Sequence, residues 1–225
     1  MIRGFFITGT DTGVGKTHVT ALLLAELRRR GHNAAAFKPI ACGPGGRHDA
    51  EIYRRIMGNS VPLKLLNPIY LRHPLAPSVA AKLENRRIDL RAVFRAYSSI
   101  INHHSAILVE GAGGLLVPIK RNYFVADLAR DLGLPLIIVT RLGLGTINHT
   151  LLTCRQARAM GLKIAGIVLN DTTGRRGLAE KTNIQVLPAL CGVPLLGIMP
   201  HGDHGAARAA QAICRRLLLL HKRSE

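Results

Sequence analysis

Nine residues near the start of the chain, Gly9 to Thr17, read Gly-Thr-Asp-Thr-Gly-Val-Gly-Lys-Thr. They lie between an apolar run, Phe5 to Ile7, and a stretch of helical character, His18 to Arg30. A strand, a glycine-rich loop and a helix in this order create a phosphate site, because backbone N–H groups and the positive end of the helix dipole face the anion. A loop that only closes a turn is the alternative. The flanking strand and helix and the Gly-Lys-Thr ending favour binding of ATP or GTP.

The end of this loop assigns two side chains to the ligand. Lys16 would reach the β- and γ-phosphates, and the hydroxyl of Thr17 would bind Mg²⁺. Five residues separate Gly9 from Gly15, one more than in the common phosphate loop, so we predict a lengthened glycine loop.

The length and composition indicate one globular nucleotide-binding domain over residues 1–225, with 48% hydrophobic residues. No run of about 18 apolar residues predicts a membrane span, and the first residues lack the pattern of a signal peptide. We therefore expect a cytoplasmic protein. The four cysteines are widely spaced, which argues against a disulfide framework or a zinc site.

The chain is strongly basic, with 31 Lys and Arg against 13 Asp and Glu and a net charge of +18. Such an excess favours polyanions in general. The basic residues are scattered in short groups, such as Arg28 to Arg30 and Arg215-Arg216, without the interleaved aromatic residues that stack on single strands. We expect a solvated basic surface and no specific nucleic-acid binding.

Apolar runs alternate with helical stretches along the whole chain. The runs are continuous in hydrophobicity, as in strands buried on both faces of a parallel sheet. They are Ile2–Thr8, Ala34–Lys38, Ala106–Glu110, Leu136–Thr140, Ala165–Asn170 and Leu195–Met199. The pattern predicts an α/β fold, a three-layer, doubly wound, mainly parallel sheet of the P-loop NTPase type. The proline-rich interval from Leu63 to Leu90 is expected to be a long, irregular surface excursion.

Ligands of such a sheet gather at the carboxyl ends of the strands, and three charged residues there suit a Mg²⁺·ATP site. Glu110, which ends a predicted strand, is the first candidate for a carboxylate ligand of Mg²⁺. Asp49 is the second, with capping of a helix N-terminus as its alternative role. Lys38 follows the second predicted strand, where its ammonium would stabilise charge on a transferred phosphoryl group.

Six motifs occur in a fixed order: Gly9–Thr17, Lys38–Gly43, His48–Ala50, Val109–Gly114, Leu144–His149 and Leu169–Asp171. Together they resemble dethiobiotin synthetase, over nearly the whole chain from Phe5 to about His204. The resemblance implies a cytoplasmic homodimer in biotin biosynthesis. It also implies an enzyme that uses ATP, Mg²⁺ and CO₂ to close a ureido ring on 7,8-diaminononanoate.

The resemblance also implies roles for individual residues. Lys16 and Lys38 would be catalytic, and Thr17, Asp49 and Glu110 would hold Mg²⁺. The nucleotide would contact Gly13, Val14, Gly15, Lys16, Thr17, His18, Asp49, Glu110, Gly111, Ala112, Gly113, Asn170, Asp171, Pro200, His201 and Gly202. Asn170 would recognise adenine, since an amide offers both a donor and an acceptor. The second substrate would contact Thr12, Cys42, Gly145, Thr146, Ile147 and Asn148, the last four across the dimer interface.

Three positions depart from the family pattern. Gly13 stands where some members carry Glu, Cys42 replaces a Ser, and Ser78 follows Ala76-Pro77 where His is frequent. A thiol is a weaker hydrogen-bond donor than a hydroxyl, so the change at Cys42 is expected to weaken a substrate contact.

Two other functions remain open at this point. One is a nucleotide-dependent switch of the partition and division-site ATPase group, which shares the sheet and the lengthened loop. Those ATPases carry a signature lysine four residues before the last glycine of the loop, where this chain has Asp11. The other is an uncharacterised ligase that forms amides or ureas.

Overall fold

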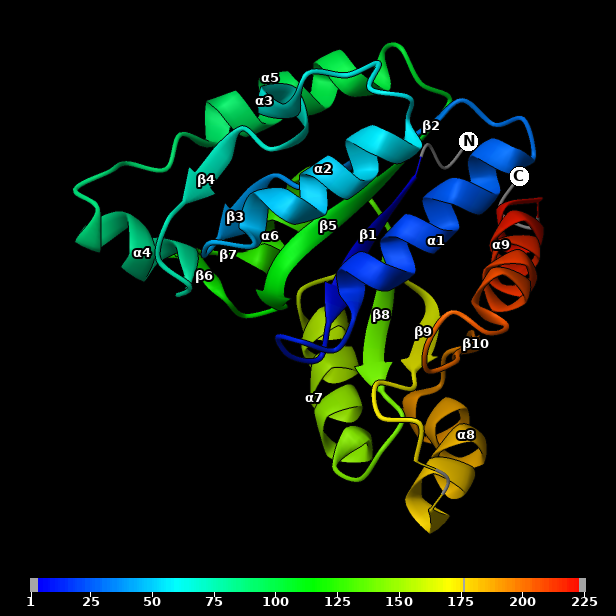
Figure 1. Ribbon diagram of the computed structural model, residues 1–225. Helices are drawn as coiled ribbons and strands as arrows, with labels where there is room; N and C mark the ends of the chain where they lie inside the picture. Colours follow the sequence, from blue (N-terminus) through cyan, green and yellow to red (C-terminus); the bar gives the residue numbers. More distant parts are fainter. Residues whose placement is uncertain (1–3, 176, 223–225) are drawn as a thin grey trace.

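The structure is a computed structural model that describes residues 4–175 and 177–222, with only the backbone for residues 220–222. Within these residues the central element is a sheet of six parallel strands in the order β10-β9-β8-β1-β5-β2 (Figure 1). The strands are β1 (Gly4–Gly9), β2 (Ala34–Phe37), β5 (Ala106–Gly114), β8 (Leu136–Arg141), β9 (Ile164–Asn170) and β10 (Leu195–Met199). Each predicted strand therefore exists. Ile2 and Arg3 of the first one lie outside the described residues.

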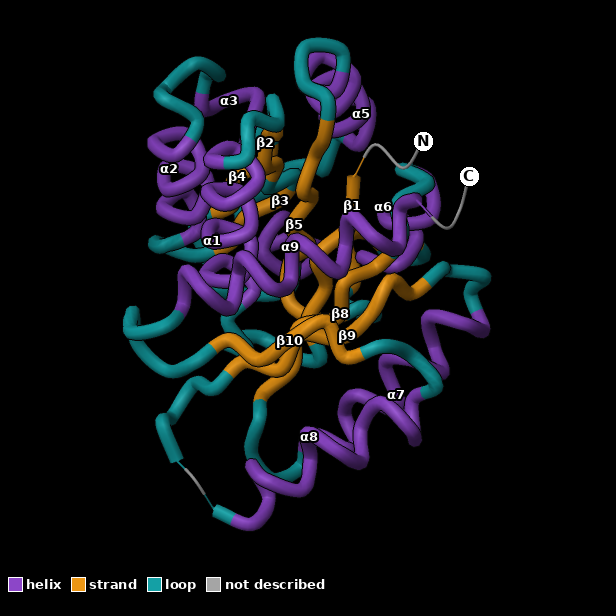
Figure 2. The backbone as a smooth tube through the Cα atoms, turned by 90° about the vertical axis from the view of Figure 1, so that its right-hand side faces the viewer, coloured by secondary structure: helices purple, strands orange, loops and turns teal. Residues whose placement is uncertain are grey.

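Helices cover both faces of the sheet, which makes three layers (Figure 2). One face carries α2 (Gly46–Ile56), α1 (Lys16–Arg29) and α9 (Ala206–Lys222), which run side by side in Figure 1. The other carries α5 (Leu90–Ile101), α6 (Val125–Asp131), α7 (Thr146–Ala159) and α8 (Leu178–Cys191). This is the α/β arrangement of the P-loop NTPases, and it confirms the predicted fold class. Within the described residues, no helix is both long enough and apolar enough to cross a lipid bilayer.

The expectation of an irregular surface excursion from Leu63 to Leu90 was wrong. This interval contains α3 (Leu63–Leu66), β4 (Ile69–Leu71) and α4 (Pro77–Leu83), and β4 pairs with β3 (Ile40–Cys42). Elements of three to seven residues are too short to show a hydrophobic period. Pro77, which the prediction counted among the irregular residues, starts α4, where its fixed φ and missing N–H fit the first helical turn. A further small hairpin joins β6 (Pro118–Lys120) to β7 (Tyr123–Phe124).

The register of the sheet brings the predicted functional residues together. Glu110 lies opposite Ile7, two residues before the glycine loop begins. Phe37 lies opposite Val109, so that Lys38 emerges from β2 beside Glu110. Glu110 does not end its strand as predicted, because β5 continues to Gly114. The core supports this edge from below, with Phe6, Ile7, Val109 and Ile138 fully buried.

A buried acid joins α1 to α9. Glu26 is 7% exposed and accepts hydrogen bonds from Arg29 Nε at 2.7 Å and Arg30 Nε at 2.5 Å. Arg30 in turn donates to the carbonyl of Gln211 on α9 at 3.2 Å. The hydrogen bond from Arg29, and then that from Arg30, outweighs the burial and lowers the pKa of Glu26 to about 2. The α1 helix that follows the glycine loop is thus anchored at its far end.

Glu26→Gln is expected to lower the free energy of unfolding at pH 7 by about 1–3 kcal/mol, because two charged hydrogen bonds are weakened. The lowered pKa means that this stabilisation is present above the usual pKa of Glu and fades as the pH falls toward about 2. The difference between wild type and variant should therefore be smaller at pH 3 than at pH 7 in urea unfolding. Glu51→Gln, at an exposed position on α2, is the control and should change little. A difference that stays constant with pH would contradict the assignment.

Candidate active site

The glycine loop folds over the start of α1. Gly13 and Gly15 have positive φ values of 72° and 90°, which favour glycine. The Lys16 ammonium lies back across the loop and donates to the carbonyl of Asp11 at 2.9 Å. Lys16 is 7% exposed, and this burial is the main reason that its pKa falls to about 8. An anion placed in the loop would supply the negative charge that this buried ammonium needs.

The other side of the loop rests on Asn170, at the end of β9. Asn170 Nδ2 donates to the carbonyl of Val14 at 2.9 Å, and the side chain is 5% exposed. The approach is so close that a Cβ on Gly15 would lie 1.9 Å from Asn170 Nδ2. Asn170 therefore supports the shape of the loop, in addition to the adenine contact that the sequence predicts for it. Asp171, which is also buried, accepts from the N–H of Gly174 at 2.8 Å and shapes the next loop.

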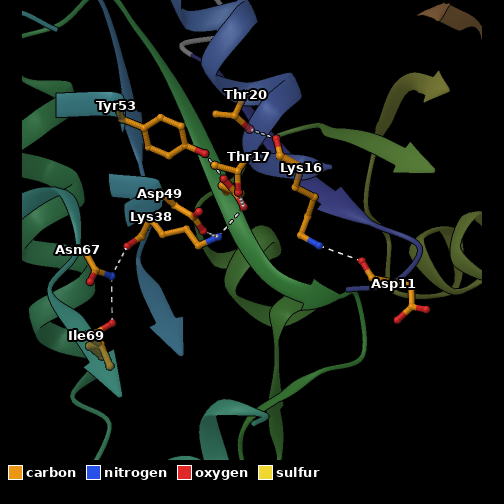
Figure 3. A network of polar contacts seen from close by, with 10 residues as sticks. Asp11, Lys16, Thr17, Thr20, Lys38, Asp49, Tyr53, Asn67 and Ile69 are labelled. Atoms are coloured by element: carbon orange, nitrogen blue, oxygen red, sulfur yellow. Dashed lines mark hydrogen bonds and ion pairs between the residues drawn. The ribbon is translucent and has the colours of Figure 1, made fainter. Parts of the chain in front are cut away.

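The predicted carboxylates converge on Lys38 (Figure 3). Lys38 Nζ lies 2.8 Å from Asp49 Oδ2 and 2.5 Å from Glu110 Oε1. Thr17 Oγ1 donates to the same Glu110 oxygen at 3.0 Å. Burial alone would lower the pKa of Lys38, but Glu110 and Asp49 outweigh the desolvation and raise it. The structure thus joins residues of β2, α1, α2 and β5 in one charged cluster.

This cluster has the ligand chemistry that Mg²⁺ prefers. Two carboxylates face a positive charge, the ammonium of Lys38, and the hydroxyl of Thr17 is bonded to one of them. Hard divalent cations bind oxygen donors and retain water. The residues present therefore fit Mg²⁺. In residues 4–175 and 177–222, no three or more His, Cys, Asp and Glu side chains gather into a metal site, and this cluster combines two carboxylates with a hydroxyl.

Asp49 is not a helix N-cap, the alternative that the sequence left open. It lies inside α2, whose N-cap is Gly45, and its side chain is available to Lys38.

Sequence reasoning missed two residues of the cluster. Tyr53 is fully buried and its hydroxyl donates to Glu110 Oε2. Burial, and then the charge of Glu110, raises the pKa of Tyr53 well above its ordinary value, which keeps the phenol protonated. Asn67 Nδ2 donates to the carbonyls of Lys38 and Ile69 at 2.9 and 3.0 Å. The spacing of Tyr53, four residues after Asp49, is a signal that could have placed both on one helix face.

A cavity of about 490 Å³ opens beside the cluster. Its lining includes Thr12, Lys38, Cys42, Asp49 and Gly113, together with Pro77 at the start of α4. Burial raises the pKa of the Cys42 thiol to about 11, so the group is a neutral thiol near pH 7. A nucleophilic role for Cys42 would need the thiolate, and the structure does not favour one.

The remaining predicted residues lie in the later part of β5, near the starts of α1 and α7, and after β10. Gly111 to Gly113 continue β5, and His18 is exposed on α1. Pro200 to Gly202 follow β10, where His201 packs against Gly174. Gly145 to Asn148 begin α7, with Gly145 and Asn148 exposed and Ile147 half-buried. The Thr146 hydroxyl is buried and bonded to Thr140 at 2.7 Å, so it faces the interior.

The sheet and the lengthened glycine loop define a P-loop nucleotide-binding protein. Solved structures with the same fold match it at low identity. MinD, a cell division ATPase of Pyrococcus furiosus, matches with a TM-score of 0.61 and 18% identity over 98% of this chain and 100% of that one. A septum site-determining MinD of Pyrococcus horikoshii, complexed with Mg-ADP, matches with a TM-score of 0.58 and 18% identity over 100% and 98%.

Sequence relatives assign the family. A family model described as an AAA domain matches residues 3–206. The ATP-dependent dethiobiotin synthetase of Bacillus velezensis is 42% identical over 213 residues, which are 93% of this chain and 91% of the relative. That of Anaeromyxobacter sp. is 48% identical over 172 residues, 76% and 77% of the two chains. The chain belongs to the ATP-dependent dethiobiotin synthetases, which confirms the resemblance seen in its motifs.

Gly15→Ala is expected to weaken ATP binding at least about tenfold, because it combines a left-handed backbone with a collision against Asn170. Gly13→Ala is the matched control. It carries the same kind of backbone strain, but among the described residues no atom lies within 4 Å of the added methyl group. Isothermal titration with ATP in MgCl₂ measures both. Equal losses in the two variants would show that the Asn170 contact does not determine the shape of the loop.

Proposed function

We propose that this protein closes the ureido ring of dethiobiotin. It would use ATP, Mg²⁺ and CO₂, act on 7,8-diaminononanoate, and release ADP and phosphate. The observation that carries the proposal is the convergence of Lys16, Thr17, Lys38, Asp49 and Glu110 beside a cavity with room for a second substrate. The family of the chain supports the same reaction.

The reaction begins when one amine of the substrate binds CO₂ as a carbamate and releases a proton. A carbamate is a poor electrophile, because its negative charge is shared by two oxygens. One of these oxygens accepts the γ-phosphoryl group of ATP, and the bond to ADP breaks. The neighbouring amine then attacks the carbamoyl carbon, phosphate leaves, and the ring closes with loss of the second proton. The two amines belong to one molecule, so proximity favours the last step.

The residues of the site position these groups and neutralise their charge, which is what phosphoryl transfer requires. Lys16 binds the phosphates from the glycine loop. Lys38 lines the cavity together with Asp49, and its ammonium would stabilise both the carbamate and the γ-phosphate. Thr17, Asp49 and Glu110 would hold Mg²⁺, which supplies positive charge to the phosphate oxygens.

The substrate amines would enter the cavity lined by Thr12 and Cys42. We place the far end of the substrate, its carboxylate, at Gly145 to Asn148 of a second subunit. The support is the exposure of Gly145 and Asn148, and of Leu144, which is 93% exposed just before α7. We propose a homodimer in which this segment meets the site of the other subunit. We also propose a single domain in each subunit and a cytoplasmic location.

Lys38→Met is expected to reduce ADP formation by at least about 100-fold, because a cation next to the transferred phosphoryl group is lost. Lys16→Met should do the same. The assay measures ADP release with ATP, Mg²⁺, bicarbonate and the diamine, and leaves out one component at a time. Lys163→Met, an exposed residue next to the amino end of β9, is the control and should keep full activity. ATP turnover that does not depend on the diamine and increases when DNA is added would favour a function like that of the division-site ATPases.

Cys42→Ser is expected to lower the KM for the diamine a few-fold and leave kcat unchanged, because a hydroxyl is the stronger hydrogen-bond donor. Cys42→Ala should raise the same KM or leave it unchanged. Steady-state kinetics with varied diamine and saturating ATP measures all three proteins. Loss of turnover in the Ala variant would reveal a chemical role for the thiol and would contradict the assignment.

A further inference from the structure

The two oxygens of Glu110 are used differently. Oε1 accepts from Lys38 and Thr17, on the side where Asp49 also lies. Oε2 accepts from the hydroxyl of Tyr53. Glu110 is 1% exposed and Tyr53 is fully buried, so the protein itself supplies the donors of this carboxylate. A carboxyl group held at both oxygens by different elements has one fixed orientation.

We propose that Tyr53 is a positioning residue of the active site, whose hydroxyl turns Glu110 so that Oε1 faces the metal and nucleotide. From the proposed function, this inference takes only that the site binds Mg²⁺ together with ATP. It concerns binding and not ring closure. Tyr53 acts through Glu110, and Glu110 separates it from the ligands.

The α2 helix gives this arrangement a simple origin. Asp49 and Tyr53 are four residues apart, so they project from one face of the helix, one turn from each other. The same face is packed into the core at Ala50 and Met57. One helix face thus supplies a carboxylate to the cation site and holds the second carboxylate in place from behind.

Removing the hydroxyl would leave Glu110 Oε2 buried without its donor. A buried acceptor that loses its partner bears the cost of desolvation, so the carboxylate would rotate toward the remaining donors or admit water. Rotation moves Oε1 away from Thr17, and a water in place of the hydroxyl holds the orientation of the carboxylate less firmly. The hydrogen bonds on the Oε1 side come from groups that a bound cation would compete with, whereas the one from Tyr53 lies on the opposite oxygen.

The test compares wild type with Tyr53→Phe, which keeps the ring and removes the hydroxyl. ATP binding is followed by isothermal titration at a series of MgCl₂ concentrations and in EDTA. We expect the Mg²⁺ concentration that half-saturates the enhancement of ATP binding to rise about tenfold, equivalent to about 1.4 kcal/mol. Affinity for ATP in EDTA should change by less than about twofold, because the neutral Tyr53 hydroxyl acts on Glu110 and not directly on the phosphates.

Tyr123→Phe is the matched control, because Tyr123 also donates to a carboxylate, Asp131, at 2.7 Å but lies on β7. It should leave the Mg²⁺ dependence as in wild type. Combining Tyr53→Phe with Glu110→Gln tests the route of the effect. If Tyr53 acts through Glu110, the Tyr53 change should add little to the Mg²⁺ requirement of the Glu110 variant.

Three results would overturn the proposal. One is an unchanged Mg²⁺ dependence in Tyr53→Phe, and another is a full additional effect in the Glu110→Gln background. The third is an equal loss of affinity with and without Mg²⁺, which would show that Tyr53 only supports packing. If Tyr53→Phe folds poorly by circular dichroism, Tyr53→Met, a long apolar side chain without a hydroxyl, is measured in the same way. Failure of ring closure with normal Mg²⁺-dependent ATP binding would reject the proposed function and leave this inference intact.

Discussion

The burial of the Glu110 carboxylate is the constraint on which the active edge of the sheet depends. A carboxylate with 1% exposure is costly unless it is paired and hydrogen-bonded. Its donors come from three separate segments: Thr17 from α1, Lys38 from the end of β2, and Tyr53 from α2. Loss of Lys38 would leave the charge of Glu110 without this ion pair, and loss of Tyr53 would leave Oε2 without its donor. Packing of these three segments at this edge therefore also assembles the site.

The same pairing balances the charge of the site before any ligand arrives. Lys38 faces two carboxylates, whereas the Lys16 ammonium donates to a backbone carbonyl. Burial lowers the pKa of Lys16 to about 8, whereas the two acids raise that of Lys38. The loop thus holds a buried cation that a phosphate would satisfy. The carboxylates of Asp49 and Glu110 hold the ammonium of Lys38. Mg²⁺ can take the place of this ammonium only if Lys38 moves toward the incoming phosphate. Metal and nucleotide are expected to bind more strongly together than apart.

The hydrophobic pattern of the sequence predicted the long helices and the strands of the central sheet. It did not predict the short elements α3, β4 and α4. The six strands of the sheet were recognisable because both of their faces are buried, and the glycine loop because its shape requires glycine. The bounds of the first predicted helix shifted slightly, because the stretch His18 to Arg30 corresponds to α1, Lys16–Arg29. The segment from Leu63 to Leu90 was misjudged because tertiary hydrogen bonds, such as those of Asn67, organise it.

Within the site, the motifs predicted Lys16, Thr17, Lys38, Asp49 and Glu110. Contacts join the last four, and Lys16 lies within electrostatic range of Lys38, Asp49 and Glu110. Tyr53 escaped notice because a tyrosine inside an amphipathic helix is usually core, and only the distance to Glu110 distinguishes it. The Asn170 contact with the loop escaped for a similar reason. Its partner is a backbone carbonyl 156 positions away in sequence, which no local pattern reveals.

The position of Asp11 separates this chain from the division-site ATPases that share its fold. Those proteins carry a signature lysine at the place in the loop where Asp11 stands, and a cation there could serve a bound phosphate. Here the side chain is an acid, and Arg141 at the end of β8 donates to it at 2.8 Å. The pair is half-exposed and neutralises itself, so the position offers the phosphates no net positive charge. In the proposed reaction the additional cation would come instead from Lys38, which lines the cavity. A cation placed there would serve a phosphoryl acceptor bound in the cavity, which is the requirement of a ligase and not of a switch.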